Sequence, residues 1–305
     1  MTLDFSFQKI IDRLLRCSAY YAPRSLQNFG WFLLMHWFHA VILGIVEGLT
    51  EFVPISSTGH LIIVSDFLKL EGATVKVFEI FIQLGAICAV LGLYRQKFLN
   101  LMAFKKNVSD DRLGLVGWNG IFLLILTTVP ALFLGALLHD FIKRNLFSSA
   151  VVAVGLCAGA ILMIFAEKLF AEKLSSSKSS AALNARKAFA FGCFQCLALW
   201  PGMSRSASTI AGGLFLGMNR QDAAEYSFFA AFPVILAAVL FDTYKSRAVI
   251  TASDVPLFVV GFVVSFLFAW LSIKFFIQKL NQWTLVPFAY YRIILAALIF
   301  LRIYC

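Results

Sequence analysis

The sequence predicts an all-α polytopic membrane protein with two inverted repeats, containing about six transmembrane helices and two pairs of re-entrant helices. Three observations predict this fold: few charged residues, long apolar runs, and an internal repeat in which each half has a helix broken at proline. Only 14% of the 305 residues are charged and 61% are hydrophobic, whereas about a quarter of a typical soluble domain is charged. The deficit indicates a large lipid-facing surface.

The apolar runs are long enough to cross a bilayer. Each approaches the roughly 20 residues that a helix needs to span the hydrocarbon core. The runs are continuous rather than alternating, which favours helices over a membrane β-barrel. The clearest of them are 121–138, 150–165, 257–273 and 288–301.

The net charge of +10 would suggest nucleic-acid binding in a soluble protein. Here most basic residues flank apolar runs, so we expect them to set orientation and to contact anionic lipid, with no nucleic-acid partner. Loops around 95–112 and 168–187 hold many of these basic residues. Because cytoplasmic loops are enriched in Lys and Arg, we expect these loops in the cytoplasm and both ends of the membrane-spanning region outside.

The N-terminal extension, residues 1–30, mixes basic with bulky apolar residues. It lacks the continuous apolar region of a signal peptide. It is either an amphipathic segment lying on the membrane surface or a partly disordered tail.

The internal repeat pairs GIVEGLTEFVPISST at 44–58 with GCFQCLALWPGMSRS at 192–206. Each segment begins as an apolar helix, breaks at proline, which lacks an N–H group, and restarts among hydroxyl residues. Non-helical backbone at membrane depth is tolerated only where it lines a protected cavity. We therefore predict re-entrant hairpins from 32–53 with 55–70, and from 188–200 with 203–218.

Three predicted spans separate the hairpins, and an odd number inverts the second half relative to the first. Inverted repeats bring their broken helices face to face near the bilayer midplane. The predicted organisation is the extension, a first repeat at 31–170, a loop rich in Ser, Ala and Lys at 171–187, and a second repeat at 188–305. The predicted spans are 77–94, 118–138, 147–168, 222–243, 255–275 and 286–303.

Glu47 and Glu51 stand four residues apart on the first broken helix, which puts both carboxylates on one face. Two acids at membrane depth are costly unless something compensates them. A divalent cation is the simplest compensation, because Mg²⁺ binds one or two carboxylates together with substrate phosphate. The alternative is that one glutamate is protonated and hydrogen-bonded.

The hydroxyl residues Ser56, Ser57 and Thr58 follow the first break, where free N–H groups of a restarting helix form an anion site. Ser57 and His60 are three residues apart, so the imidazole could activate the hydroxyl as a nucleophile. Alternatively His60 itself takes the phosphoryl group, or the segment is an ordinary helix cap with a buried histidine.

Arg205 stands in the second break, between Ser204 and Ser206. A guanidinium group binds phosphate through two parallel hydrogen bonds and stays charged, and the two serines can add hydroxyls or caps. If Arg205 only neutralises the glutamates, it still lies in the same cavity. Gln195 takes the place of Glu47 in the second repeat and could hydrogen-bond to the site.

At these residues the sequence resembles the undecaprenyl-diphosphatase family, known for bacitracin resistance, over roughly 36–304. The motifs are EGLTEFVPISSTGH at 47–60, KVFEIFIQLGAICAV at 76–90 and CFQCLALWPGMSRSAST at 193–209. The resemblance implies hydrolysis of a polyprenyl diphosphate lipid in bacterial cell-wall synthesis, dependence on Mg²⁺ or Ca²⁺, a homodimer, and a site open to the outer face of the cytoplasmic membrane. It implies that the essential residues are Glu47, Glu51, Ser57, His60 and Arg205, supported by Thr58 and Ser204.

The residues leave the nucleophile open among Ser57, His60 and a metal-activated water. A rival function is a transporter or flippase of polyprenyl phosphate lipid, because inverted repeats with broken helices are a common transporter architecture. The different chemistry of the two halves favours the enzyme.

Overall fold

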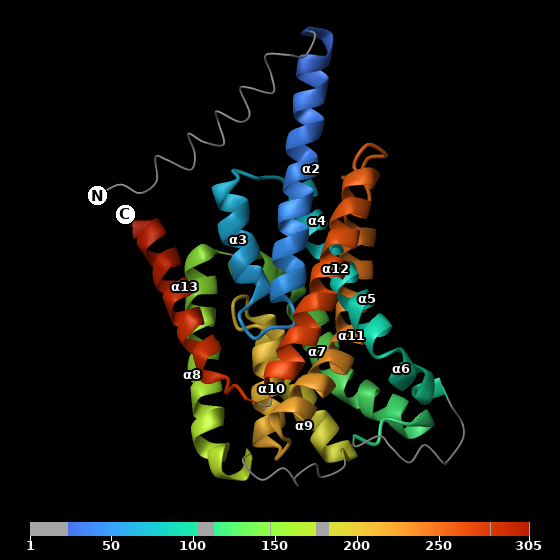
Figure 1. Cartoon of the computed structure of the whole chain (residues 1–305), viewed down its shortest axis with the longest axis vertical. Helices are drawn as coiled ribbons and strands as arrows, with labels where there is room; N and C mark the ends of the chain where they lie inside the picture. The colour runs from blue at the N-terminus through green and yellow to red at the C-terminus, as the bar shows by residue number, and fades with distance from the viewer. Residues whose placement is uncertain (1–23, 103–112, 147, 175–182, 281, 305) are drawn as a thin grey trace.

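The computed structural model describes residues 24–102, 113–146, 148–174, 183–280 and 282–304, so most of the predicted extension 1–30 lies outside the described residues. All regular elements in these ranges are helices, which confirms the all-α prediction (Figure 1). In chain order they are α2 (Arg24–Thr50), α3 (Ser57–Phe67), α4 (Ala73–Phe81), α5 (Gln83–Leu93), α6 (Arg95–Met102), α7 (Gly117–Asn145), α8 (Ser149–Leu174), α9 (Ala185–Cys196), the 3-10 turn η1 (Leu197–Leu199), α10 (Arg205–Phe215), α11 (Arg220–Lys245), α12 (Val255–Leu280) and α13 (Val286–Tyr304).

Within the described ranges, six helical stretches are long and apolar enough to cross a membrane. Each overlaps one predicted span, so the multi-pass prediction is confirmed. Bulky side chains such as Phe133, Leu271 and Ile294 are exposed along them, as expected of a surface that faces lipid. The stretches are Ala73–Leu93, Gly117–Ile142, Ser149–Phe170, Arg220–Lys245, Val255–Leu280 and Val286–Tyr304.

Three local features differ from the sequence expectation. The first span is two short helices, α4 and α5, that meet at Ile82, and the helix α6 follows it where a loop was expected. The helices α8 and α9 also extend into both ends of the predicted loop 171–187. The middle of that loop, 175–182, lies outside the described residues.

The two broken helix pairs use the same backbone device. Ser56 precedes α3 and Ser204 precedes α10, with φ of 72° and 67°. Each serine caps its helix by accepting a hydrogen bond from the backbone N–H three residues on, in Gly59 and Ala207. A positive φ is rare and strained for a residue other than glycine, so its recurrence at equivalent positions supports the internal repeat.

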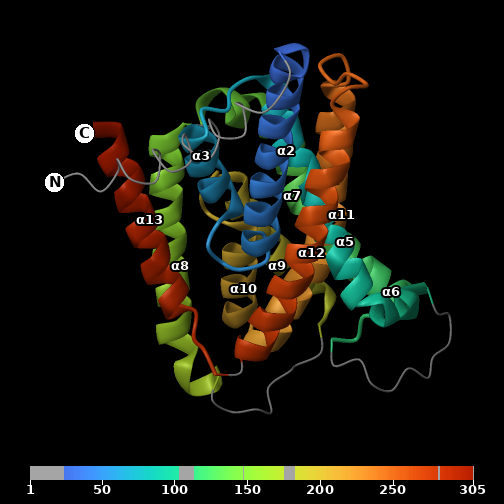
Figure 2. The same cartoon turned by 45° about the horizontal axis from the view of Figure 1, so that its top comes forward.

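The two pairs enter from opposite ends of the molecule. In Figures 1 and 2, α2 and α3 come from the end where α13 finishes, and α9 and α10 come from the other end. Their breaks meet near the middle, as inverted repeats require; the repeat symmetry itself remains a prediction.

Helix α12 packs backbone to backbone against α2 and α5 through glycines. A Cβ atom on Gly48 would lie 2.5 Å from the Ser265 carbonyl oxygen, and one on Gly85 would lie 2.2 Å from that of Phe262. Small residues allow such close helix crossings. This packing fixes α2, which carries Glu47 and ends one residue before Glu51, against the core of the molecule.

Candidate active site

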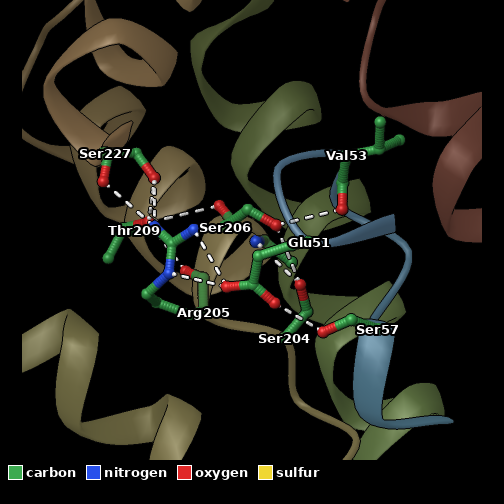
Figure 3. A network of polar contacts seen from close by, with 9 residues as sticks. Glu51, Val53, Ser57, Ser204, Arg205, Ser206, Thr209 and Ser227 are labelled. Carbon is green, nitrogen blue, oxygen red and sulfur yellow. Dashed lines mark hydrogen bonds and ion pairs between the residues drawn. The ribbon is translucent and has the colours of Figure 1, made fainter. Parts of the chain in front are cut away.

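The side chain of Glu51 joins the two broken helices (Figure 3). Its Oε2 accepts a hydrogen bond of 2.6 Å from the Ser57 hydroxyl, and its Oε1 lies 3.4 Å from both Nε and Nη2 of Arg205. The Glu51 and Arg205 side chains are only 9% and 10% exposed. An acid from one repeat and a guanidinium from the other therefore share one pocket.

Several contacts fix the Arg205 side chain. Its Nη1 donates to the backbone carbonyl and the hydroxyl of Ser227, at 3.0 and 3.3 Å. Its guanidinium carbon lies 5.4 Å from the ring centre of Phe52, within the range of a cation–π contact. The charge is thus aimed at the break rather than at lipid.

One serine of the second break binds to the first break. The Ser206 hydroxyl donates to the Val53 carbonyl oxygen at 3.1 Å, and it lies 3.0 Å from the Ser204 hydroxyl. Figure 3 shows this connection from α10 to the turn before α3. Ser206 is fully buried and holds the two breaks together through this hydrogen bond. Ser204, in contrast, lines the cavity.

A cavity of about 200 Å³ lies between the breaks. Pockets for drug-sized ligands are about 300–1,000 Å³, so this one suits a compact polar group rather than a whole lipid. Its lining includes most of the predicted site residues, together with apolar side chains of α7, η1 and α11. The lining residues are Glu51, Ser56, Ser57, Thr58, Gln83, Ala131, Gln195, Ala198, Leu199, Pro201, Gly202, Ser204, Arg205, Val234, Ile235 and Ala238.

Glu47 lies one turn before Glu51 and is fully buried, outside the set that lines the cavity. Neither of its carboxylate oxygens has a hydrogen-bond partner among the described residues. Burying such a group without compensation is costly. The unsatisfied oxygens fit the predicted role of Glu47 as a ligand to a cation.

The carboxylate groups near the cavity can bind a divalent cation only if the substrate supplies further oxygen ligands. In the described part of the chain, no three His, Cys, Asp or Glu side chains gather into a metal-binding group. Glu47 and Glu51 would supply carboxylate oxygens, and a bound phosphate would supply others. Mg²⁺ is commonly held in this way.

His60 is directed away from Ser57. Its Nδ1 lies 2.8 Å from the Ser56 carbonyl oxygen and its Nε2 lies 2.7 Å from the Tyr291 hydroxyl, with the two rings stacked. The carbonyl can only accept, so Nδ1 carries the hydrogen and Nε2 of the neutral ring accepts from Tyr291. The expected Ser57–His60 contact is replaced by Ser57–Glu51, because a carboxylate is the stronger acceptor for a hydroxyl.

Arg292 on α13 is a central residue to which sequence reasoning gave no role. Its guanidinium is fully buried and donates to the carbonyl oxygen of Pro54 in the first break and to those of Gly202 and Met203 in the second, at 3.4, 2.8 and 2.9 Å. It also donates to two carbonyls of α8, those of Gly155 and Leu156. The only sequence signal was an isolated arginine inside an apolar run.

Comparisons with known proteins cover nearly the whole chain. The family model of the bacitracin resistance protein BacA matches residues 40–298. An undecaprenyl-diphosphatase of Maridesulfovibrio salexigens is 50% identical over 86% of this chain and 97% of its own length. A protein of the same name from Lawsonia intracellularis is 45% identical over 88% of this chain and 100% of its own length. Another, from Nitratidesulfovibrio vulgaris strain DP4, is 48% identical over 86% of this chain and 96% of its own length.

Proposed function

Because the chain belongs to the family of the bacitracin resistance protein BacA, we propose that it hydrolyses undecaprenyl diphosphate to undecaprenyl phosphate and inorganic phosphate in the cavity between the two breaks. The name shared by its relatives bears out the family and the phosphatase class predicted from the motifs. The observation that carries the proposal at the site is the Glu51 carboxylate held between Ser57 and Arg205.

The diphosphate binds where two helices begin. Ser57 and Arg205 are the first residues of α3 and α10, so unpaired N–H groups and the positive ends of both helix dipoles lie beside the cavity. Arg205 neutralises phosphate charge, and the hydroxyls of Ser56, Thr58 and Ser204 add hydrogen bonds. Phosphoryl transfer depends mainly on such positioning and charge neutralisation.

Ser57 is the nucleophile that this geometry favours. Its hydroxyl proton passes to Glu51 as Oγ attacks the terminal phosphorus; the new P–O bond forms, the anhydride bond breaks, and the lipid monophosphate leaves with the proton from Glu51. Water then attacks the phosphoserine and gives a proton to Glu51, which returns it to Ser57 Oγ as phosphate leaves. His60 is a poorer nucleophile because both of its ring nitrogens already have partners.

Glu47 and Glu51 would hold the divalent cation, Mg²⁺ or Ca²⁺. When bound, such a cation neutralises charge on the phosphate oxygens. The unpaired oxygens of Glu47 support this assignment.

The proposed location is the bacterial cytoplasmic membrane, with the cavity open to the outer face, where the enzyme recycles the lipid carrier of cell-wall synthesis and confers resistance to bacitracin. The surplus of basic residues in the loops assigned to the cytoplasm supports this orientation. A homodimer is proposed from the family resemblance.

The test is phosphate release from farnesyl or undecaprenyl diphosphate by purified protein. We expect release that stops with EDTA and returns when Mg²⁺ is restored. Lipid movement across sealed vesicles without phosphate release would instead support the transporter. The repeats differ where chemistry is needed, with Leu199 in place of Glu51 and Ser208 in place of His60, which favours the enzyme.

A further inference from the structure

One buried acceptor without a hydrogen-bond partner lies at the cavity itself. Gln195 on α9 is 2% exposed and lines the cavity together with Glu51, Ser57 and Arg205. Its Nε2 donates to the Thr127 carbonyl oxygen at 3.4 Å, whereas its Oε1 has no hydrogen-bond partner among the described residues. Buried polar atoms are almost always paired, so an unpaired one at a cavity needs an explanation.

The Gln195 amide is held in one orientation. Only its nitrogen can face the Thr127 carbonyl, because two oxygens would repel each other. The Thr127 hydroxyl is itself bound to the carbonyls of Leu123 and Ala188. A Cβ on Gly192 would lie 2.5 Å from the same Thr127 oxygen, so α9 and α7 are in backbone contact and leave the Gln195 amide little room to shift.

The unpaired Oε1 of Gln195 is a hydrogen-bond acceptor, which limits the groups that can bind to it. Phosphate oxygens of a diphosphate are themselves acceptors, so the ligand must bring a hydrogen or a positive charge. The donor that the reaction requires is water. In other phosphoryl-transfer enzymes, a glutamine side chain orients the attacking water.

We infer that Gln195 positions the water that hydrolyses the phosphoserine at Ser57, by accepting one of its hydrogens at Oε1. This inference rests on the proposed function. In this step water forms a new bond to phosphorus, the bond from phosphorus to Ser57 Oγ breaks, and the proton lost by water reaches Oγ through Glu51. Gln195 holds the water and takes no proton.

The test compares Gln195→Leu with Gln195→Glu, and uses Cys193→Ala as a control on the exposed face of the same helix. For Gln195→Leu we expect kcat to fall about 100-fold, the size of a lost positioning contact, with KM nearly unchanged. A first-turnover burst of lipid monophosphate should precede phosphate release, because the phosphoserine accumulates. Gln195→Glu keeps an acceptor oxygen, so its kcat should stay within about tenfold of the wild type.

Several outcomes would overturn the inference. One is a kcat of Gln195→Leu that recovers at saturating Mg²⁺, which would make Gln195 a cation ligand. Others are a raised KM with normal kcat, or slow turnover without a burst. If Gln195→Leu does not fold, a 100-fold loss of kcat in Gln195→Glu would decide against it. Wild-type protein and Cys193→Ala that release no phosphate would reject the proposed function itself.

Discussion

At the scale of single residues, the proposed mechanism implies that Glu51 couples substrate binding to activation of Ser57. In the free protein its carboxylate is shared between the Ser57 hydroxyl and the Arg205 guanidinium. An entering diphosphate competes for Arg205, and the carboxylate that loses its cation becomes a stronger acceptor for the Ser57 proton. Under the proposed mechanism, Ser57 is therefore activated most strongly when a substrate is present.

Replacing Arg205 tests the guanidinium contact. Arg205→Ala should lower kcat/KM about 1,000-fold, because an arginine that stabilises a transferring phosphoryl group contributes at least this much. Arg205→Lys should recover little, since an ammonium group cannot form the paired contacts. The exposed Arg302→Ala is the control. Phosphate release by purified, membrane-extracted protein measures the effect; near-normal turnover of Arg205→Ala would contradict the proposed site.

Trapping the phosphoenzyme tests the nucleophile. Acid quenching during turnover should give a phosphopeptide with the modification on Ser57, and Ser57→Ala should give none and lose activity. His60→Gln should still be phosphorylated on Ser57, because His60 contacts Tyr291 and the Ser56 carbonyl rather than the reacting hydroxyl. Mass spectrometry that places the phosphate on His60 would reverse this assignment.

The sequence was sufficient to predict that Glu51, Ser57 and Arg205 gather here but not every pairing. The internal repeat predicted that Arg205 meets Glu51, whereas Glu47, one turn earlier, lies outside the residues that line the cavity. Spacing also allowed Ser57 to meet His60; the choice of Glu51 depends on the turn 51–55, which periodicity does not define. The role of Arg292 was invisible because its partners are backbone carbonyls, which every residue has.

At the scale of elements, the most informative feature is the left-handed serine that begins both α3 and α10. The side chain caps the helix while the backbone adopts a conformation suited to glycine. The break thus combines strain with a compensating hydrogen bond, and it directs the first helical residue, Ser57 or Arg205, toward the cavity.

Substitution of Ser204 separates these two contributions. Ser204→Ala loses the cap and keeps the strain, so it should destabilise the protein by about 1–2 kcal/mol. Ser204→Gly relieves the strain and should cost only a few tenths of a kcal/mol. Unfolding in mixed micelles followed by circular dichroism measures both. Equal stability of the two variants would show that the positive φ carries no cost.

Prediction of elements succeeded where patterns are local. Apolar runs and prolines located all six spans and both breaks, because each signal lies within one element. Helix α6 was missed because RQKFLNLM is polar and short, and its position depends on packing against α7. The joint at Ile82 has no proline or glycine to mark it.

At the scale of the whole molecule, Arg292 connects the C-terminal helix to both halves of the site. One guanidinium holds carbonyls of both breaks and of α8. A Cβ on Gly159 would lie 2.1 Å from its Nη2, so α8 is shaped to admit it. These carbonyl dipoles replace the water that the charge loses on burial.

Loss of this residue should affect fold and activity together. Arg292→Met leaves several buried carbonyls without donors, and each costs about 1–3 kcal/mol, so we expect a large fall in unfolding temperature and no turnover. Arg292→Lys should retain part of the stability. Tyr290→Phe, which alters an exposed side chain two positions before, is the control. Normal melting and activity of Arg292→Met would exclude the connecting role.

The place of Arg292 in the chain has a consequence for biosynthesis. Helix α13 leaves the ribosome after the other described helices, and until it docks, neither break has its carbonyls bound by the guanidinium. During synthesis, the proposed site residues therefore enter the membrane before the two breaks are joined by Arg292. These residues are Glu47, Glu51, Ser57 and Arg205. We therefore expect hydrolytic competence to arise only after α13 has been translated, and a chain that stops before residue 286 should insert without becoming an enzyme.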